Sequence, residues 1–171
     1  MGFAEIGLSI TIGLAIWTDW RKQKIYNALL LPAFLLALAI RSYQGGWFSF
    51  KEGLAGAGVG FLLLIIPYFL GGMGAGDVKF LAVIGAFGGA RFAFTGFLYG
   101  AIGGGLISAV LLWRRRALGF TVKRFLLLIP LLVNPQELAN DMRSARQEKF
   151  PYGIALGVGA LMAMFLPLRG L

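Results

Sequence analysis

The sequence predicts an all-α, polytopic integral membrane protein with about six transmembrane helices in a glycine-rich bundle. Of its 171 residues, 58% are hydrophobic and only 13% are charged. A water-soluble domain has roughly 45–50% apolar and about 25% charged residues, so this chain has too few charges for a solvated surface. The 26 glycines and the mean hydropathy of +0.80 agree with a membrane bundle. Apolar runs recur without a compositional break, which predicts a single transmembrane domain over residues 1–171.

Six apolar runs are candidates for membrane spans, because a spanning helix needs about 20 mostly apolar residues. The first run precedes its basic residues, the reverse of a cleaved signal peptide, so we expect a retained helix with its N-terminus outside. The fourth run is short, and we expect part of the glycine-rich stretch before it to lie within the membrane. The six runs cover residues 2–17, 28–40, 53–70, 78–89, 92–113 and 152–168.

The basic residues predict the orientation, because Lys and Arg collect at the cytoplasmic ends of spans. With the N-terminus outside, twelve of the 16 fall on the inner side of a plasma (inner) membrane. This bias also accounts for the net charge of +9 without a nucleic-acid partner. Residues 125–133 are too short to cross and contain Pro130, so we interpret them as an interfacial piece of the inner loop, residues 114–151. A seventh span there would instead put the C-terminus inside.

Glycines recur four residues apart within several of these runs. Such spacing lets helix backbones approach closely, since helices in lipid associate through packing contacts. We therefore expect a tightly packed bundle and not a wide pore. The pairs are Gly56 and Gly60, Gly85 and Gly89, Gly100 and Gly104, and Gly153 and Gly157.

The chain contains no cysteine and no histidine. This excludes disulfides, thiol nucleophiles, iron–sulfur clusters, zinc knuckles and Ser-His-Asp arrangements. No metal or cofactor is expected, and any chemistry must come from carboxylates, amines or hydroxyls. Five of the seven acidic residues fall near outer helix ends or in the polar inner loop, where a carboxylate is ordinarily solvated: Glu5, Glu52, Glu137, Asp141 and Glu148.

Two carboxylates remain: Asp19 at the inner end of the first run and Asp77 at the start of the fourth. An ionisable group at membrane depth costs at least about 2.5–3.5 kcal/mol, so such residues usually serve a function. Gly74 and Gly76 give the backbone freedom and leave room for another chain beside Asp77. The glycines fit neither a P-loop nor a dinucleotide-binding pattern. The competing interpretation of Asp77 is a snorkelling residue in a helix-breaking loop.

The predicted topology places Asp19 and Asp77 on the same side of the membrane. Two carboxylates in a partly dry cleft do not both ionise easily, so they tend to share one proton. The ionised one could draw a proton from water as it attacks a peptide carbonyl, while the protonated one donates to the carbonyl oxygen or the leaving nitrogen.

Three segments in register resemble the prepilin peptidases, membrane aspartyl proteases of the GxGD type. They are GAGD within GGMGAGDVKF, DWRKQKIYN at residues 19–27, and FPYGIALGVGAL at residues 150–161. The longer, bifunctional members carry a cysteine-bearing methyltransferase segment. This cysteine-free chain resembles the short forms that serve tight-adherence (Flp-type) pili.

The resemblance implies that Asp19 and Asp77 are catalytic and that Gly74 and Gly76 support the loop of the second aspartate. It also implies cleavage, at the cytoplasmic side, of the short basic leader of a prepilin or pseudopilin precursor, after a glycine and before a hydrophobic helix. Tyr152 and Gly153 either line the cleft or simply begin a helix.

Tyr26 departs from the family pattern, which often has proline before the residue that corresponds to Asn27. We expect this to alter the turn into the second helix and not the chemistry. Lys22 would share the helical face of Asp19 if the helix continues, whereas Lys79 would not face Asp77 on a regular helix. Both are more typical of membrane anchors.

Two other functions fit the sequence less well. A small ion-coupled transporter could use an intramembrane aspartate and a broken helix, but no inverted repeat is visible. A membrane scaffold of a secretion apparatus would need neither aspartate.

Overall fold

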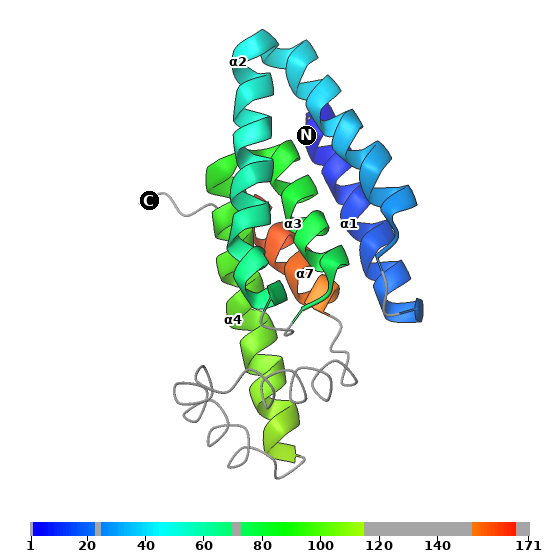
Figure 1. Ribbon diagram of the computed structural model, residues 1–171, viewed down its shortest axis with the longest axis vertical. Coiled ribbons are helices and arrows are strands. Elements are labelled where there is room, and N and C mark those ends of the chain that lie inside the picture. The colour runs from blue at the N-terminus through cyan, green and yellow to red at the C-terminus, as the bar shows by residue number, and fades with distance from the viewer. Residues whose placement is uncertain (1, 23–24, 70–72, 115–151, 167–171) are drawn as a thin grey trace.

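The computed structural model describes residues 2–22, 25–69, 73–114 and 152–166, and all regular structure in these ranges is helical (Figure 1). The prediction of an all-α chain is therefore confirmed for the described residues. The helices in chain order are α1 (Phe3–Lys22), α2 (Asn27–Phe69), α3 (Ala75–Gly88), α4 (Ala90–Arg114) and α7 (Tyr152–Phe165).

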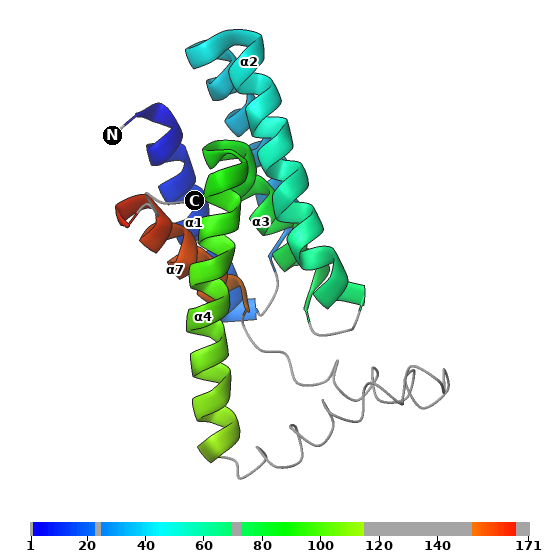
Figure 2. The ribbon, with the colours of Figure 1, turned by 90° about the vertical axis from the view of Figure 1, so that its left-hand side faces the viewer.

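Helix α2 bends back on itself at Gly45 and Gly46, and its two arms diverge from the bend with α3 between them (Figures 1 and 2). Gly46 has φ 59° and ψ −149°, a conformation that only glycine adopts without strain. We predicted two helices, residues 28–40 and 53–70, separated by a longer connection. That prediction is wrong in its boundaries, because residues 41–52 contain no proline and the two glycines suffice to reverse the chain.

Arg41 secures the bend of α2 to the end of α3. Its Nε donates to the carbonyl oxygen of Phe87 at 2.9 Å, and its Nη1 forms an ion pair with Oε2 of Glu52 at 3.2 Å. A cation at the C-terminal end of α3 also complements the helix dipole. Sequence reasoning treated Glu52 as an ordinary solvated carboxylate and missed this ion pair.

Helix α3 is the centre of the bundle, since nine of its 14 residues are buried. Phe80, Leu81 and Ile84 are fully enclosed, and they share one core with Ile12 of α1 and Leu64 of α2. Helix α7 packs against α4, α1 and α3. This arrangement holds the start of α3 close to the end of α1 and the start of α7, at the lower end of both views (Figures 1 and 2).

Glycines form the closest helix contacts, as the sequence predicted. A Cβ added at Gly56 would meet the backbone of Gly85, and the reverse is also true, so α2 and α3 touch main chain to main chain. A Cβ at Gly60 would likewise meet the backbone of Leu81. Gly159 of α7 makes the same kind of contact with Gly100 of α4.

The helix boundaries place both candidate aspartates inside helices. Helix α1 continues to Lys22, beyond the predicted end at residue 17, and α3 begins at Ala75 instead of residue 78. With 14 residues, α3 is about 21 Å long, shorter than a hydrocarbon core of about 30 Å.

Among the described residues, one helix, α2, is long and apolar enough to cross a membrane. The six predicted spans, and the orientation drawn from them, stay predictions. The interfacial piece predicted at residues 125–133 and the end of the last predicted run lie outside the described residues.

Candidate active site

Asp77 occupies the first turn of α3, where backbone N–H groups have no partner within the helix. Its Oδ2 accepts a hydrogen bond from the backbone N–H of Gly74 at 3.1 Å. The backbone N–H of Asp77 in turn donates to the carbonyl oxygen of Gly74, also at 3.1 Å. The aspartate is 9% exposed. The glycine-rich stretch therefore folds as a tight helix start that fixes a buried carboxylate.

Asp19 lies in the last turn of α1 and is 4% exposed. Its carboxylate faces the backbone N–H groups of Gly153 and Ile154, in the first turn of α7. Within the described residues, its Oδ2 is buried without a hydrogen-bond partner. A buried oxygen without a hydrogen bond destabilises the fold, because its lost hydration is not compensated. Such an oxygen therefore calls for an explanation, for which a functional role is one candidate.

The two carboxylates meet at one end of the bundle, although 58 positions separate them in sequence. The charge of Asp19 acts on Asp77, although less strongly than burial and the hydrogen bond from Gly74 do. Each sits at the N-terminal end of a helix, Asp77 in α3 and Asp19 against α7, where the helix dipole favours negative charge. The structure thus puts Asp19 and Asp77 at the same end of the bundle, and their joint role in catalysis stays a prediction.

Gly74 and Gly76 serve the site through space and not through unusual backbone angles. Gly74 has φ −82°, and neither residue is among the positive-φ glycines of the described chain. The expected use of conformations forbidden to other residues is therefore wrong. A Cβ at Gly76 would lie 3.3 Å from both the Cβ and the carbonyl oxygen of Ile25, so Gly76 lets Ile25 pack against the residue that precedes Asp77.

Comparison with known proteins shows the family. The model of the type IV leader peptidase family matches residues 6–134, about three quarters of the chain. The chain belongs to the type IV leader peptidase family. The match contains both aspartate segments. No solved structure gives a significant match.

Three curated relatives are each named prepilin leader peptidase/N-methyltransferase. The Pseudomonas putida protein is 35% identical over 101 residues, covering 55% of this chain and 35% of the relative. The Stutzerimonas stutzeri protein is 34% identical over 119 residues, covering 64% of this chain and 41% of the relative. The Bacillus subtilis (strain 168) protein is 35% identical over 111 residues, covering 62% of this chain and 43% of the relative. The chain thus spans about two fifths of the length of the curated relatives it matches.

The third segment of the resemblance, which includes Gly153, lies beyond the residues matched by the leader peptidase model. The structure nevertheless brings it to the site. A Cβ at Gly153 would lie 2.7 Å from Oδ2 of Asp19 and 2.8 Å from Cδ1 of Ile25. Gly153 therefore lies in the first turn of α7 and beside Asp19, so both interpretations of this glycine fit the structure.

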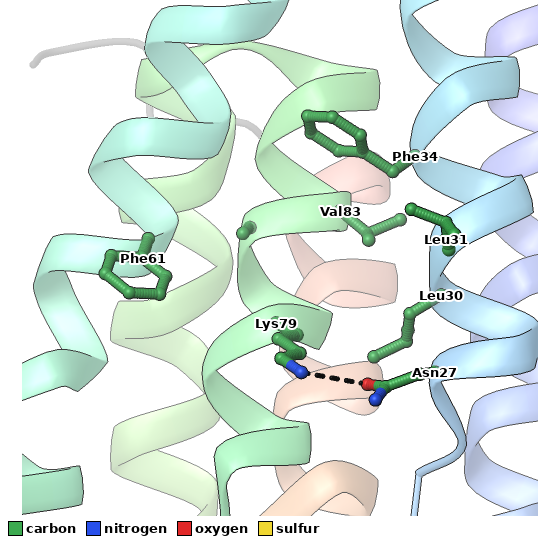
Figure 3. A pocket seen from close by; sticks show the side chains of 8 residues that line it. Asn27, Leu30, Leu31, Phe34, Phe61, Lys79 and Val83 are labelled. Atoms are coloured by element: carbon green, nitrogen blue, oxygen red, sulfur yellow. Dashed lines mark hydrogen bonds between the residues drawn. The ribbon is translucent and has the colours of Figure 1, made fainter.

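Sequence reasoning missed two features near the two aspartates. One is Ile25, which contacts both Gly76 and the position of Gly153. The other is a hydrogen bond from Nζ of Lys79 to Oδ1 of Asn27 at 3.0 Å, which joins α3 to the start of α2 across 52 positions (Figure 3). Lys79 thus does not face Asp77, as expected, but it is more than a membrane anchor.

A groove of about 360 Å³ lies between α3 and the two arms of α2 (Figure 3). Its walls are mostly apolar, and the Lys79–Asn27 hydrogen bond lies at one end. Neither Asp19 nor Asp77 lines it. The groove is therefore a feature separate from the carboxylate pair.

Proposed function

We propose that this chain is a membrane aspartyl endopeptidase that removes the short basic leader of prepilin-like (Flp-type) precursors at the cytoplasmic face. One observation carries the proposal: two buried carboxylates from distant helices lie at the same end of the bundle, where their charges interact. Membership of the type IV leader peptidase family and the names of its relatives support the reaction class.

The surface of the bundle supports a location within the bilayer. Large apolar side chains are exposed around it, including Trp20 at 76%, Ile66 at 66% and Leu62 at 64%. A soluble monomer rarely exposes this much contiguous apolar surface, whereas lipid covers it at no cost. Trp17 and Trp20 at the end of α1 suit the membrane interface, where indole rings concentrate.

The chemistry needs only the two aspartates and water. One carboxylate is ionised and takes a proton from the water whose oxygen attacks the carbonyl carbon of the scissile peptide bond. The other is protonated and donates to the carbonyl oxygen. When the tetrahedral intermediate collapses, the C–N bond breaks and the leaving nitrogen takes the proton that the first carboxylate had drawn from water. One hydroxyl of the intermediate returns its proton to the other carboxylate, so the pair again holds one proton.

The proposal predicts that Asp19→Asn and Asp77→Asn each abolish leader removal while the protein still accumulates in the membrane. An amide neither ionises nor donates a carboxyl proton, so both halves of the proton transfer are lost. The measurement is incubation of the detergent-solubilised protein with a purified Flp-type precursor, with the cleavage position determined by mass spectrometry.

Ser9→Ala is a suitable control, because it removes only a hydroxyl bonded to the backbone of α1 far from the site. Cleavage retained by either purified aspartate variant would refute the assignment. Solute uptake into proteoliposomes that disappears with Asp77→Asn would instead favour the transporter.

A further inference from the structure

We propose that Ile25 is a positioning residue that sets the spacing between Asp19 and Asp77. This inference rests on the proposed function for its kinetic consequence, but its structural part can be tested without activity. Ile25 precedes α2 and is half-buried against the core.

Ile25 lies between two glycines, each of which adjoins one carboxylate. On one side, a Cβ at Gly76 would lie 3.3 Å from the Cβ and the carbonyl oxygen of Ile25 and 3.6 Å from its nitrogen. On the other side, a Cβ at Gly153 would lie 2.8 Å from Cδ1 of Ile25. Gly76 immediately precedes Asp77, and Gly153 packs on the carboxylate of Asp19. The isoleucine thus separates the two backbones that carry or contact the pair.

The residues around Ile25 hold it to both helices. On the α1 side, Nζ of Lys22 lies 5.5 Å from the ring centroid of Tyr26, within range of a cation–π contact. On the α3 side, Lys79 donates its hydrogen bond to Asn27 at 3.0 Å. The carbonyl oxygen of Tyr26 accepts from the N–H groups of Leu29 and Leu30, which starts α2. These contacts tie the backbone around Ile25 to the ends of α1 and α3.

The two contacts of Ile25 involve different atoms, so they can be separated by substitution. The contact with Gly76 uses the backbone and Cβ, which every residue except glycine retains. The contact at Gly153 uses the terminal methyl, Cδ1, which valine and alanine lack. The β-branched side chain is stiff at χ1, which fixes the direction in which the branch that carries this methyl leaves Cβ. Ile25→Val therefore removes the Cδ1 methyl and leaves the backbone and Cβ of residue 25 in place.

The kinetic test compares the full-length protein with Ile25→Val, Ile25→Ala and Ile25→Leu on the same purified precursor. We expect kcat to fall roughly tenfold or more for valine and alanine with KM unchanged, because a misplacement of about 1 Å at reacting groups can cost on the order of 100-fold. Leucine keeps a δ-methyl and should recover part of the rate. Leu63→Ala is the matched control: it is also half-buried against the core, but lies in the second arm of α2.

The structural test uses the absence of native cysteine. Cysteines placed at Asp19 and Asp77 are joined by two bifunctional thiol reagents, one short and one longer, and the ratio of the yields is measured. Without the spacer the two positions should approach more closely, so Ile25→Val should shift the ratio toward the shorter reagent, and Leu63→Ala should not.

An unchanged ratio and an unchanged kcat in Ile25→Val would overturn the proposal, as would effects no larger than those of Leu63→Ala. If the aspartate-to-asparagine variants still cleave but the ratio shifts, the proposed function fails while the spacing role of Ile25 stands.

Discussion

At the scale of single residues, Gly153 tests how precisely the Asp19 carboxylate must be placed. Gly153→Ala would put a methyl group 2.7 Å from Oδ2 of Asp19 and 2.8 Å from Cδ1 of Ile25. Both neighbours are side chains that can shift, so the fold should survive with a displaced carboxylate. We expect kcat to fall on the order of 10- to 100-fold, with a small change in the midpoint of thermal unfolding.

Gly157→Ala is the matched control on α7. Its methyl group would also crowd side chains, at 2.9 Å from Ile16 and 3.2 Å from Ile12, but these are aliphatic. Its kcat should stay near that of the parent protein. Equal losses of kcat in the two variants would show that crowding of α7, and not displacement of Asp19, causes the effect.

The sequence identified the aspartates but not the residues that position them. Asp19 and Asp77 stood out because ionisable groups beside apolar spans are rare and expensive. Ile25 carried no such signal, since an isoleucine in an apolar chain resembles any other. The Lys79–Asn27 hydrogen bond spans 52 positions, and only the packing of α2 against α3 brings these two residues together.

At the scale of elements, the contact between α2 and α3 depends on glycine. A methyl group at Gly85 would collide with the backbone of Gly56, and backbone atoms cannot rotate away. We expect Gly85→Ala to destabilise the protein by about 3 kcal/mol, the upper part of the usual range for overpacking. The measurement is the midpoint of thermal unfolding of the detergent-solubilised protein.

Gly58→Ala should change the stability in the opposite direction. Gly58 lies in the arm of α2 that also contains Gly56. A Cβ at Gly58 has no neighbour within 4 Å, so only the backbone effect remains. Alanine is favoured over glycine inside a helix by roughly 0.5–1 kcal/mol, and the unfolding midpoint should stay the same or rise. If Gly85→Ala unfolds no earlier than Gly58→Ala, the close contact of α2 with α3 is not present in solution.

Hydropathy predicted that helices exist but misplaced their ends. Apolar runs report which residues suit lipid, whereas a helix ends where its hydrogen bonding stops. Helix α1 therefore continues through polar residues to Lys22, and α2 continues to its bend at Gly45 and Gly46. The bend itself depends on the positive φ of Gly46, which a hydropathy profile does not register.

At the scale of the whole molecule, the bundle has two distinct ends. Gly2 lies beside Gln44, so the N-terminus shares an end with the bend of α2. The carboxylate pair lies at the opposite end, beyond which α4 projects (Figure 2). Composition and the distribution of basic residues predicted such a two-ended helical bundle.

The predicted orientation places the Gln44 end outside and the carboxylate end in the cytoplasm. Because the chain has no cysteine, Gln44→Cys and Lys22→Cys each introduce a single reactive thiol, and both positions are exposed. A membrane-impermeant maleimide should label Gln44→Cys in intact cells and Lys22→Cys only after permeabilisation. Labelling of both in intact cells would place Asp19 on the outer face, where cytoplasmic cleavage of a leader could not occur. Labelling of Lys22→Cys alone in intact cells would show that the bundle has the opposite orientation and that the distribution of Lys and Arg does not predict it here.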